Sequence, residues 1–125
     1  MPSSEFIDLD GLVFKGLENY DDGDFGPETR FRYQQSGELV QATFQGGGVR
    51  VGTMVGVAEG AEIAFVWQYV SMRNTLHQGD CITKPSRRED DGLVVLHERW
   101  RIHLPVKEAG ISATIQCTND EQGDK

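Results

Sequence analysis

Apolar and polar side chains alternate along most of the chain, and short turn-forming segments interrupt this alternation at regular intervals. Such period-two alternation is typical of antiparallel β-sheets. No stretch of ten or more residues has helical periodicity, since Pro105 and Gly110 interrupt the one candidate, PVKEAG. The pattern predicts eight strands, the last of them the weakest: residues 11–18, 28–35, 39–45, 49–57, 62–70, 76–84, 93–103 and 111–118.

The connections between these strands are short and rich in glycine, as in Ser36-Gly37-Glu38 and Glu59-Gly60-Ala61. Parallel strands need long crossovers, so the chain predicts an antiparallel up-and-down meander. We therefore expect an all-β fold that closes into a small barrel of the lipocalin or avidin type. An open sheet that dimerises face to face is the alternative. The polar ends, 1–5 and 119–125, are expected to be flexible, which leaves an ordered domain over about 9–118.

The chain has 125 residues, which is the size of one domain, and a formal net charge of −8. An acidic surface repels phosphate backbones, so nucleic-acid binding is not expected. No run of apolar residues is long enough for a membrane span. The first ten residues hold three acidic groups and no basic one, unlike a secretory signal. We therefore expect a cytoplasmic protein in which Cys81 and Cys117 are free thiols.

Several strings of the sequence carry a family resemblance: LDGLVFKGLEN, GPETRFRYQQSGELVQATFQGGGVRVGTMVG, HQGDCITKP and LHERWRI. Over residues 9–103 the chain resembles a family of small bacterial proteins of unknown function that often carry the name N-acetylglutamate synthase. The resemblance implies a β architecture. The residues themselves hold no phosphate-binding motif, because Gly46-Gly47-Gly48 precedes a strand rather than a helix and lacks a Gly-Lys-Ser/Thr ending. The sequence therefore does not support an acetyltransferase activity.

Strand parity divides the side chains into two faces. The faces that hold most of the aromatic rings are predicted to point inward, because the opposite orientation would bury arginines. Glu98 falls on the inward face of 93–103, between Leu96 and Trp100. A carboxylate in apolar surroundings has a raised pKa unless a cation or hydrogen-bond donors compensate it. Glu98 is accordingly a candidate ligand anchor or general acid/base, or a structural carboxylate bonded to Tyr33, Tyr69 or an indole N–H.

The preferred hypothesis is that the barrel binds a small molecule in an aromatic-lined cavity, where Glu98 selects a cationic or hydrogen-bond-donating group. One alternative is an enzyme that uses Glu98 in the same cavity, and another is a module for protein interaction or homodimerisation with a filled core. The inward glycines Gly52 and Gly56 fit either a ligand or a bulky neighbour such as Trp67 or Trp100. The candidate ligand-binding residues are Glu98, Trp100, Tyr33, Trp67, Tyr69, Cys81, His77 and Met54.

Other reactive residues do not form recognisable motifs, and we predict no cofactor and no metal. His77 and Cys81 lie four residues apart on one strand, about 13 Å along the backbone, which is too far for direct proton transfer. The three histidines lack metal-ligand spacing. In the acidic segment with Asp21, Asp22 and Asp24, the glycine and the distal glutamate of a calcium loop are out of place, so we interpret the segment as a solvated turn.

Overall fold

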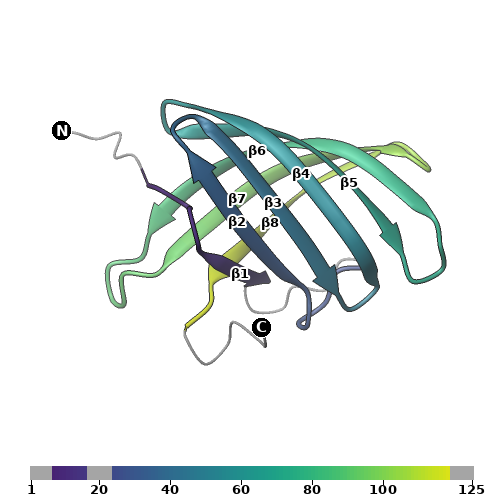
Figure 1. The fold of residues 1–125 in the computed structure, drawn as a ribbon, viewed down its shortest axis with the longest axis horizontal. Helices are drawn as coiled ribbons and strands as arrows, with labels where there is room; N and C mark the ends of the chain where they lie inside the picture. Colours follow the sequence, from purple (N-terminus) through teal and green to yellow (C-terminus); the bar gives the residue numbers. More distant parts are fainter. Residues whose placement is uncertain (1–6, 17–23, 119–125) are drawn as a thin grey trace.

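The computed structural model describes residues 7–16 and 24–118, in which eight strands pair in chain order, each antiparallel to the next (Figure 1). The last strand pairs with the first, which closes the sheet into a barrel. The all-β prediction and the closed barrel are confirmed, and the open sheet is wrong. The strands are β1 (Val13–Gly16), β2 (Arg30–Ser36), β3 (Leu39–Gly46), β4 (Val49–Glu59), β5 (Glu62–Ser71), β6 (Leu76–Arg87), β7 (Val94–Leu104) and β8 (Glu108–Gln116).

The strand boundaries differ from the predicted ones mainly in two places. β6 continues to Arg87, because Pro85 pairs in register with Leu96 and does not end the strand. β8 begins at Glu108, inside the segment that had no predicted structure, and pairs with β7 from its first residue. The flexible ends predicted over 1–5 and 119–125, and the end of the first predicted strand, lie outside the described residues. Among those residues, no helix is long and apolar enough to cross a membrane.

The predicted alternation of inward and outward side chains agrees with the burial along the strands. On β5, Ile63, Phe65, Trp67 and Tyr69 are buried, whereas the outward Val66 is 55% exposed. On β7, Leu96 is buried and Glu98 follows it on the same face. The core is therefore the inside of the barrel.

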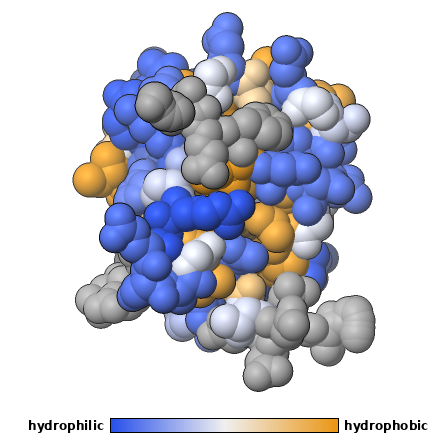
Figure 2. Space-filling model, turned by 90° about the vertical axis from the view of Figure 1, so that its left-hand side faces the viewer, coloured by the Kyte–Doolittle hydropathy of each residue, from blue (hydrophilic) through white to orange (hydrophobic). Residues whose placement is uncertain are grey.

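The segment before β1 closes one end of the barrel. Leu9 is completely buried, and its backbone N–H donates to Oε1 of Gln35. Ile7 packs into the same hydrophobic core. This end, where the hairpins after β2, β4 and β6 lie, faces the viewer in Figure 2, in which polar side chains surround smaller apolar areas. We call the opposite end, where β1–β2, β3–β4, β5–β6 and β7–β8 connect, the mouth.

Four inward aromatic rings lie across the strand from a glycine. In each pair the two residues are register partners, and a Cβ added to the glycine would come within 2.7 Å of the ring. The rings therefore lie against the barrel wall, where a side chain would otherwise stand. For Gly52 and Gly56 the bulky neighbours are phenylalanines rather than the predicted tryptophans. The pairs are Phe44–Gly52, Phe65–Gly56, Trp67–Gly79 and Trp100–Gly110.

The tightest of these positions is Gly79, and we predict that Gly79→Ala destabilises the fold. The new Cβ would lie 2.0 Å from the carbonyl oxygen of Arg101 and 2.4 Å from the Trp67 ring. Overpacking of this kind typically costs about 1–3 kcal/mol in the free energy of unfolding, which urea denaturation would measure. Gly60→Asn is the control, because Gly60 is an exposed turn residue with a left-handed φ that Asn tolerates. Equal stabilities of the two variants would contradict the packing argument.

Candidate functional site

The barrel contains a cavity of about 220 Å³ that reaches from its middle to the mouth. Seven of the eight candidate residues line it: Met54, Trp67, Tyr69, His77, Cys81, Glu98 and Trp100. Tyr33 is not among the lining residues. It is buried nearer the closed end, where its ring makes edge contacts with Phe14 and Phe65.

Of the described residues, Glu98 is the one that places a carboxylate in the interior part of this cavity. Its register partner on β8 is Ser112, which also lines the cavity and hydrogen-bonds to the carboxylate. Burial raises the pKa of Glu98 to about 7, and the Ser112 hydrogen bond opposes that rise only in part. Ser112 thus takes the role expected of Tyr33, Tyr69 or an indole. Sequence reasoning missed it, although parity on β8 places it on the inward face.

At the mouth, Asp24 joins two of the predicted residues. Its Oδ2 accepts a hydrogen bond of 2.9 Å from the Tyr69 hydroxyl and lies 3.4 Å from Nε2 of His77. The rings of Tyr69 and His77, which are register partners on β5 and β6, stack with centroids 4.4 Å apart. Asp24 lies in a turn, as predicted, but its carboxylate is bonded within the protein and is only partly solvated, with 32% of the side chain exposed. Asp21 and Asp22 lie outside the described residues.

Phe25, the next residue, is a second part of the mouth that sequence reasoning missed. Its ring lies 5.1 Å from that of Tyr69, 5.9 Å from that of Phe31 and 6.0 Å from that of Phe44, measured between centroids. It therefore covers the inward aromatic rings at this end of the cavity. The available signal was an aromatic residue inside the otherwise polar segment DDGDFGPET.

The glycine-rich β3–β4 turn holds Asp24 and Phe25 in place. The N–H of Gly48 donates to the backbone oxygen of Asp24 at 2.8 Å. A Cβ on Gly48 would come within 2.9 Å of that same backbone, so only glycine allows this approach. Thr29 adds a second link, because its hydroxyl donates to the Gly46 carbonyl and accepts from the N–H of Gly26. Gly46-Gly47-Gly48 thus serves to dock the β1–β2 connection.

Cys81 and His77 do not form a nucleophile–base pair. The Cys81 thiol contacts the Thr83 hydroxyl at 3.7 Å, whereas His77 contacts Tyr69 and Asp24. Burial, with a smaller effect from the Glu98 charge, raises the pKa of Cys81 to about 12, so the nucleophilic thiolate is scarce at neutral pH. Within 7–16 and 24–118, no group of three His, Cys, Asp or Glu side chains is arranged to hold a metal ion.

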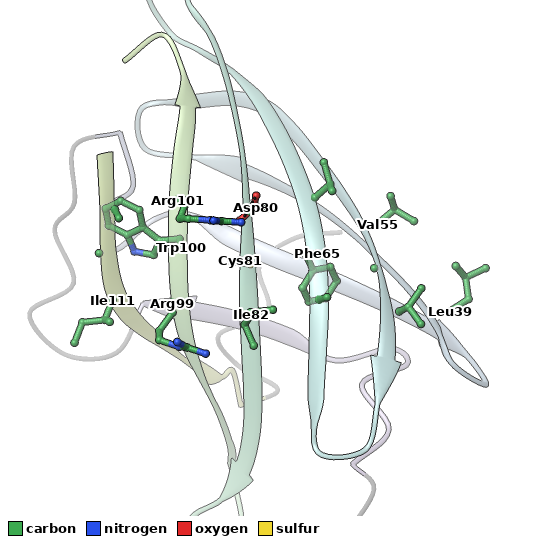
Figure 3. A pocket seen from close by; sticks show the side chains of 16 residues that line it. Leu39, Val55, Phe65, Asp80, Cys81, Ile82, Arg99, Trp100, Arg101 and Ile111 are labelled. Carbon is green, nitrogen blue, oxygen red and sulfur yellow. Dashed lines mark hydrogen bonds and ion pairs between the residues drawn. The ribbon is translucent and has the colours of Figure 1, made fainter. Parts of the chain in front are cut away.

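A second depression, of about 910 Å³, lies on the outer surface of the sheet (Figure 3). We call it the outer groove. Apolar side chains of β3 to β6 line one part of it, and Arg99, Arg101 and Asp80 line the next. Arg101 and Asp80 point toward one another and form a bidentate ion pair with distances of 2.9 and 3.1 Å. Trp100 and Cys81 contribute to both the groove and the internal cavity, which are separated only by the barrel wall.

A closed antiparallel barrel with an internal cavity, aromatic walls and a buried polar group has the architecture of small-ligand-binding β-barrels. Comparison with protein families places it more closely. A family model described as avidin-like protein matches residues 7–117, nearly the whole chain, and the chain belongs to this avidin-like family. Searches among curated proteins and among solved structures found no match. The avidin-like match does not bear on the name N-acetylglutamate synthase.

The raised pKa of Glu98 predicts a stability that falls as the pH rises. In the unfolded chain the glutamate has a pKa of 4.5, whereas in the folded state the pKa of Glu98 is about 7, so the folded state holds this proton more tightly. Between these values ionisation therefore costs the folded state on the order of 3 kcal/mol. Urea unfolding at pH 4.5 and pH 8 should show that Glu98→Gln removes this decrease.

The exposed residue Glu59 provides the matched control for that measurement. Glu59→Gln changes the net charge equally but should keep the decrease seen in the unmodified protein. If Glu98→Gln and Glu59→Gln show the same pH dependence, Glu98 is not the group responsible.

Proposed function

We propose that this protein binds a small molecule in its internal cavity, with Glu98 as the polar anchor. The observation that carries this proposal is the position of Glu98 inside a cavity of about 220 Å³ that is otherwise walled mainly by aromatic rings. Burying a carboxylate costs free energy unless hydrogen bonds or a cation stabilise its charge. Here the identified stabilising interaction is the hydrogen bond with Ser112. A ligand that donates hydrogen bonds or carries positive charge would complete it.

The size and the walls of the cavity favour binding over a filled core. Pockets for drug-sized ligands measure roughly 300–1,000 Å³, so this cavity fits a smaller metabolite. The rings reach the wall over glycines, which leaves the centre of the barrel open. Membership of the avidin-like family supports a small ligand as well. Catalysis by Glu98 has less support, because neither His77 nor Cys81 contacts it as a partner.

We expect a thermal-shift screen against a metabolite library to find compounds that raise the melting temperature. A ligand at 100 times its Kd adds about 2.7 kcal/mol of stability, which is a shift of several degrees for a domain of this size. The same compounds should lose their effect on Glu98→Gln and keep it on Glu59→Gln. Product analysis of each hit would reveal any turnover. A broad library without a hit would contradict the proposed function.

We also propose that the protein forms a homodimer through the outer groove. Its apolar part consists of outward side chains on neighbouring strands, among them Leu39, Val55, Val57 and Val66, each about half exposed. Contiguous apolar surface of this kind marks interaction sites in soluble proteins. On the far side of the patch, Ile111 is 78% exposed.

The charges beside the patch favour a second copy as the partner. Arg99, which makes no ion pair with a described residue, lies on the β7 side, while Glu38 precedes the groove residue Leu39 on the β3 side. A two-fold axis through the apolar centre exchanges these two sides, so that Arg99 of each copy approaches Glu38 of the other. The contact is apolar at its centre, so added salt should weaken it less than a contact made by charges alone.

Size-exclusion chromatography with light scattering should therefore give twice the chain mass of 13.9 kDa, even at high salt. Val66→Lys should yield a monomer, because it places a charge at the centre of the patch. Gln68→Lys, outward on the same strand but beside a different depression, is the control and should remain dimeric. A monomer at every protein concentration would rule out this interface.

A further inference from the structure

We infer that the cavity selects a ligand with a compact cationic group, such as a quaternary ammonium, held between Glu98 and the two tryptophan rings. This inference rests on the proposed small-molecule binding and narrows it to one charge class. It excludes carboxylates and other anions as ligands of the interior.

The charged groups that line the cavity are mostly acidic. Carboxylates come from three elements: Glu98 on β7, Glu108 on β8 and Asp24 on the β1–β2 connection. Neither lysine nor arginine is among the described residues that line it. The one basic side chain, His77, already lies 3.4 Å from Asp24. With a net charge of −8 on the whole chain, the field in the cavity attracts cations.

Two hydrogen-bond donors of the lining are used within the protein, which leaves the indole N–H groups of Trp67 and Trp100 as donors toward a ligand. Tyr69 donates its hydroxyl proton to Asp24, and Ser112 is bonded to Glu98. An anionic ligand would therefore exchange its water for at most these two neutral donors, beside the Glu98 carboxylate, which is costly in a buried site. A quaternary ammonium needs no donors at all, since its hydration is weak and aromatic faces can replace it.

The aromatic walls provide such faces. Trp67 lies over Gly79 and Trp100 over Gly110, so both indoles lie along the wall, and both line the cavity that Glu98 enters. Cation–π attraction is strongest for tryptophan and grows when the site excludes water. One carboxylate with two indoles is the combination by which proteins recognise ammonium groups through charge and ring faces together.

Proton release from Glu98 should accompany the binding of a cation. With a pKa raised to about 7, Glu98 is only partly ionised near neutral pH, and a bound cation favours the ionised form. As the pH rises toward about 7, the affinity for the cation should therefore increase by up to tenfold per pH unit, and above about pH 7 it should level off. His77, Asp24 and Glu108 also face the cavity, so a Glu98 variant must separate the effect of Glu98 from theirs.

The test compares ligands of one shape and different charge: choline, its neutral isostere 3,3-dimethylbutan-1-ol, and the anion 3,3-dimethylbutanoate. Tryptophan fluorescence reports binding directly, because the chain has two tryptophans and both line the cavity. At pH 8 and constant ionic strength, choline should bind at least tenfold more tightly than the alcohol, and the anion should not bind. Glu98→Gln should remove the advantage of choline and the pH dependence, whereas Glu59→Gln should retain both.

The outcomes separate this inference from the proposed function. If the alcohol or the anion binds as tightly as choline, or if the metabolite screen yields only neutral or anionic ligands, the cation preference is wrong while small-molecule binding stands. If choline binds equally well to Glu98→Gln, the assigned role of Glu98 is wrong. If no compound of either set binds, both proposals fail. Tetramethylammonium, tested beside choline, checks that the hydroxyl group is not what the protein recognises.

Discussion

The open interior of this barrel depends on the pairing of four large inward rings with glycines on neighbouring strands. An eight-stranded barrel is just wide enough for its own side chains to fill it. Here four rings lie over glycines against the wall instead of projecting toward the axis. The same pairs fix the strand register, because a shift by one residue would place a ring against a side chain. Cavity and register therefore have a common physical origin.

The position of Glu98 follows from that register. Once Trp100 is placed over Gly110, Glu98 lies opposite Ser112 and points toward the same interior. The carboxylate thus has Ser112 as its polar neighbour in a cavity that is lined mainly by aromatic rings. Burial of this carboxylate costs free energy, and the stability of the surrounding sheet keeps the side chain in this position. Such locally unfavourable residues are common at binding sites.

Much of this arrangement could be predicted from the sequence, since strand alternation is a local property. Parity alone placed Glu98, Trp67 and Trp100 on the inside of the barrel. The depth of a residue along the barrel is a different matter, because it depends on register and on what plugs each end. Tyr33 has the correct parity but lies nearer the closed end.

The contributions of Asp24 and Phe25 could not be predicted from local pattern, because they come from an irregular connection that docks on a distant turn. The close approach of Gly48 to Asp24 links residues 24 positions apart, and neither segment alone indicates the other. Ser112 was missed for a simpler reason, since a lone serine on a weakly patterned strand gives no chemical signal. Hydrophobic periodicity therefore identifies the inward residues of the strands, but it says much less about the connections at the mouth of the barrel.

The plug formed by Ile7 and Leu9 has a consequence for how anything could enter this barrel. Within the described residues, apolar side chains close one end of the barrel, and the cavity opens toward the other. The two ends of a bound molecule therefore lie in different surroundings, and the part that enters first must also leave last. Any part too long for the interior would protrude at the entrance, past Asp24 and Phe25, where a carrier or a second protein could hold it.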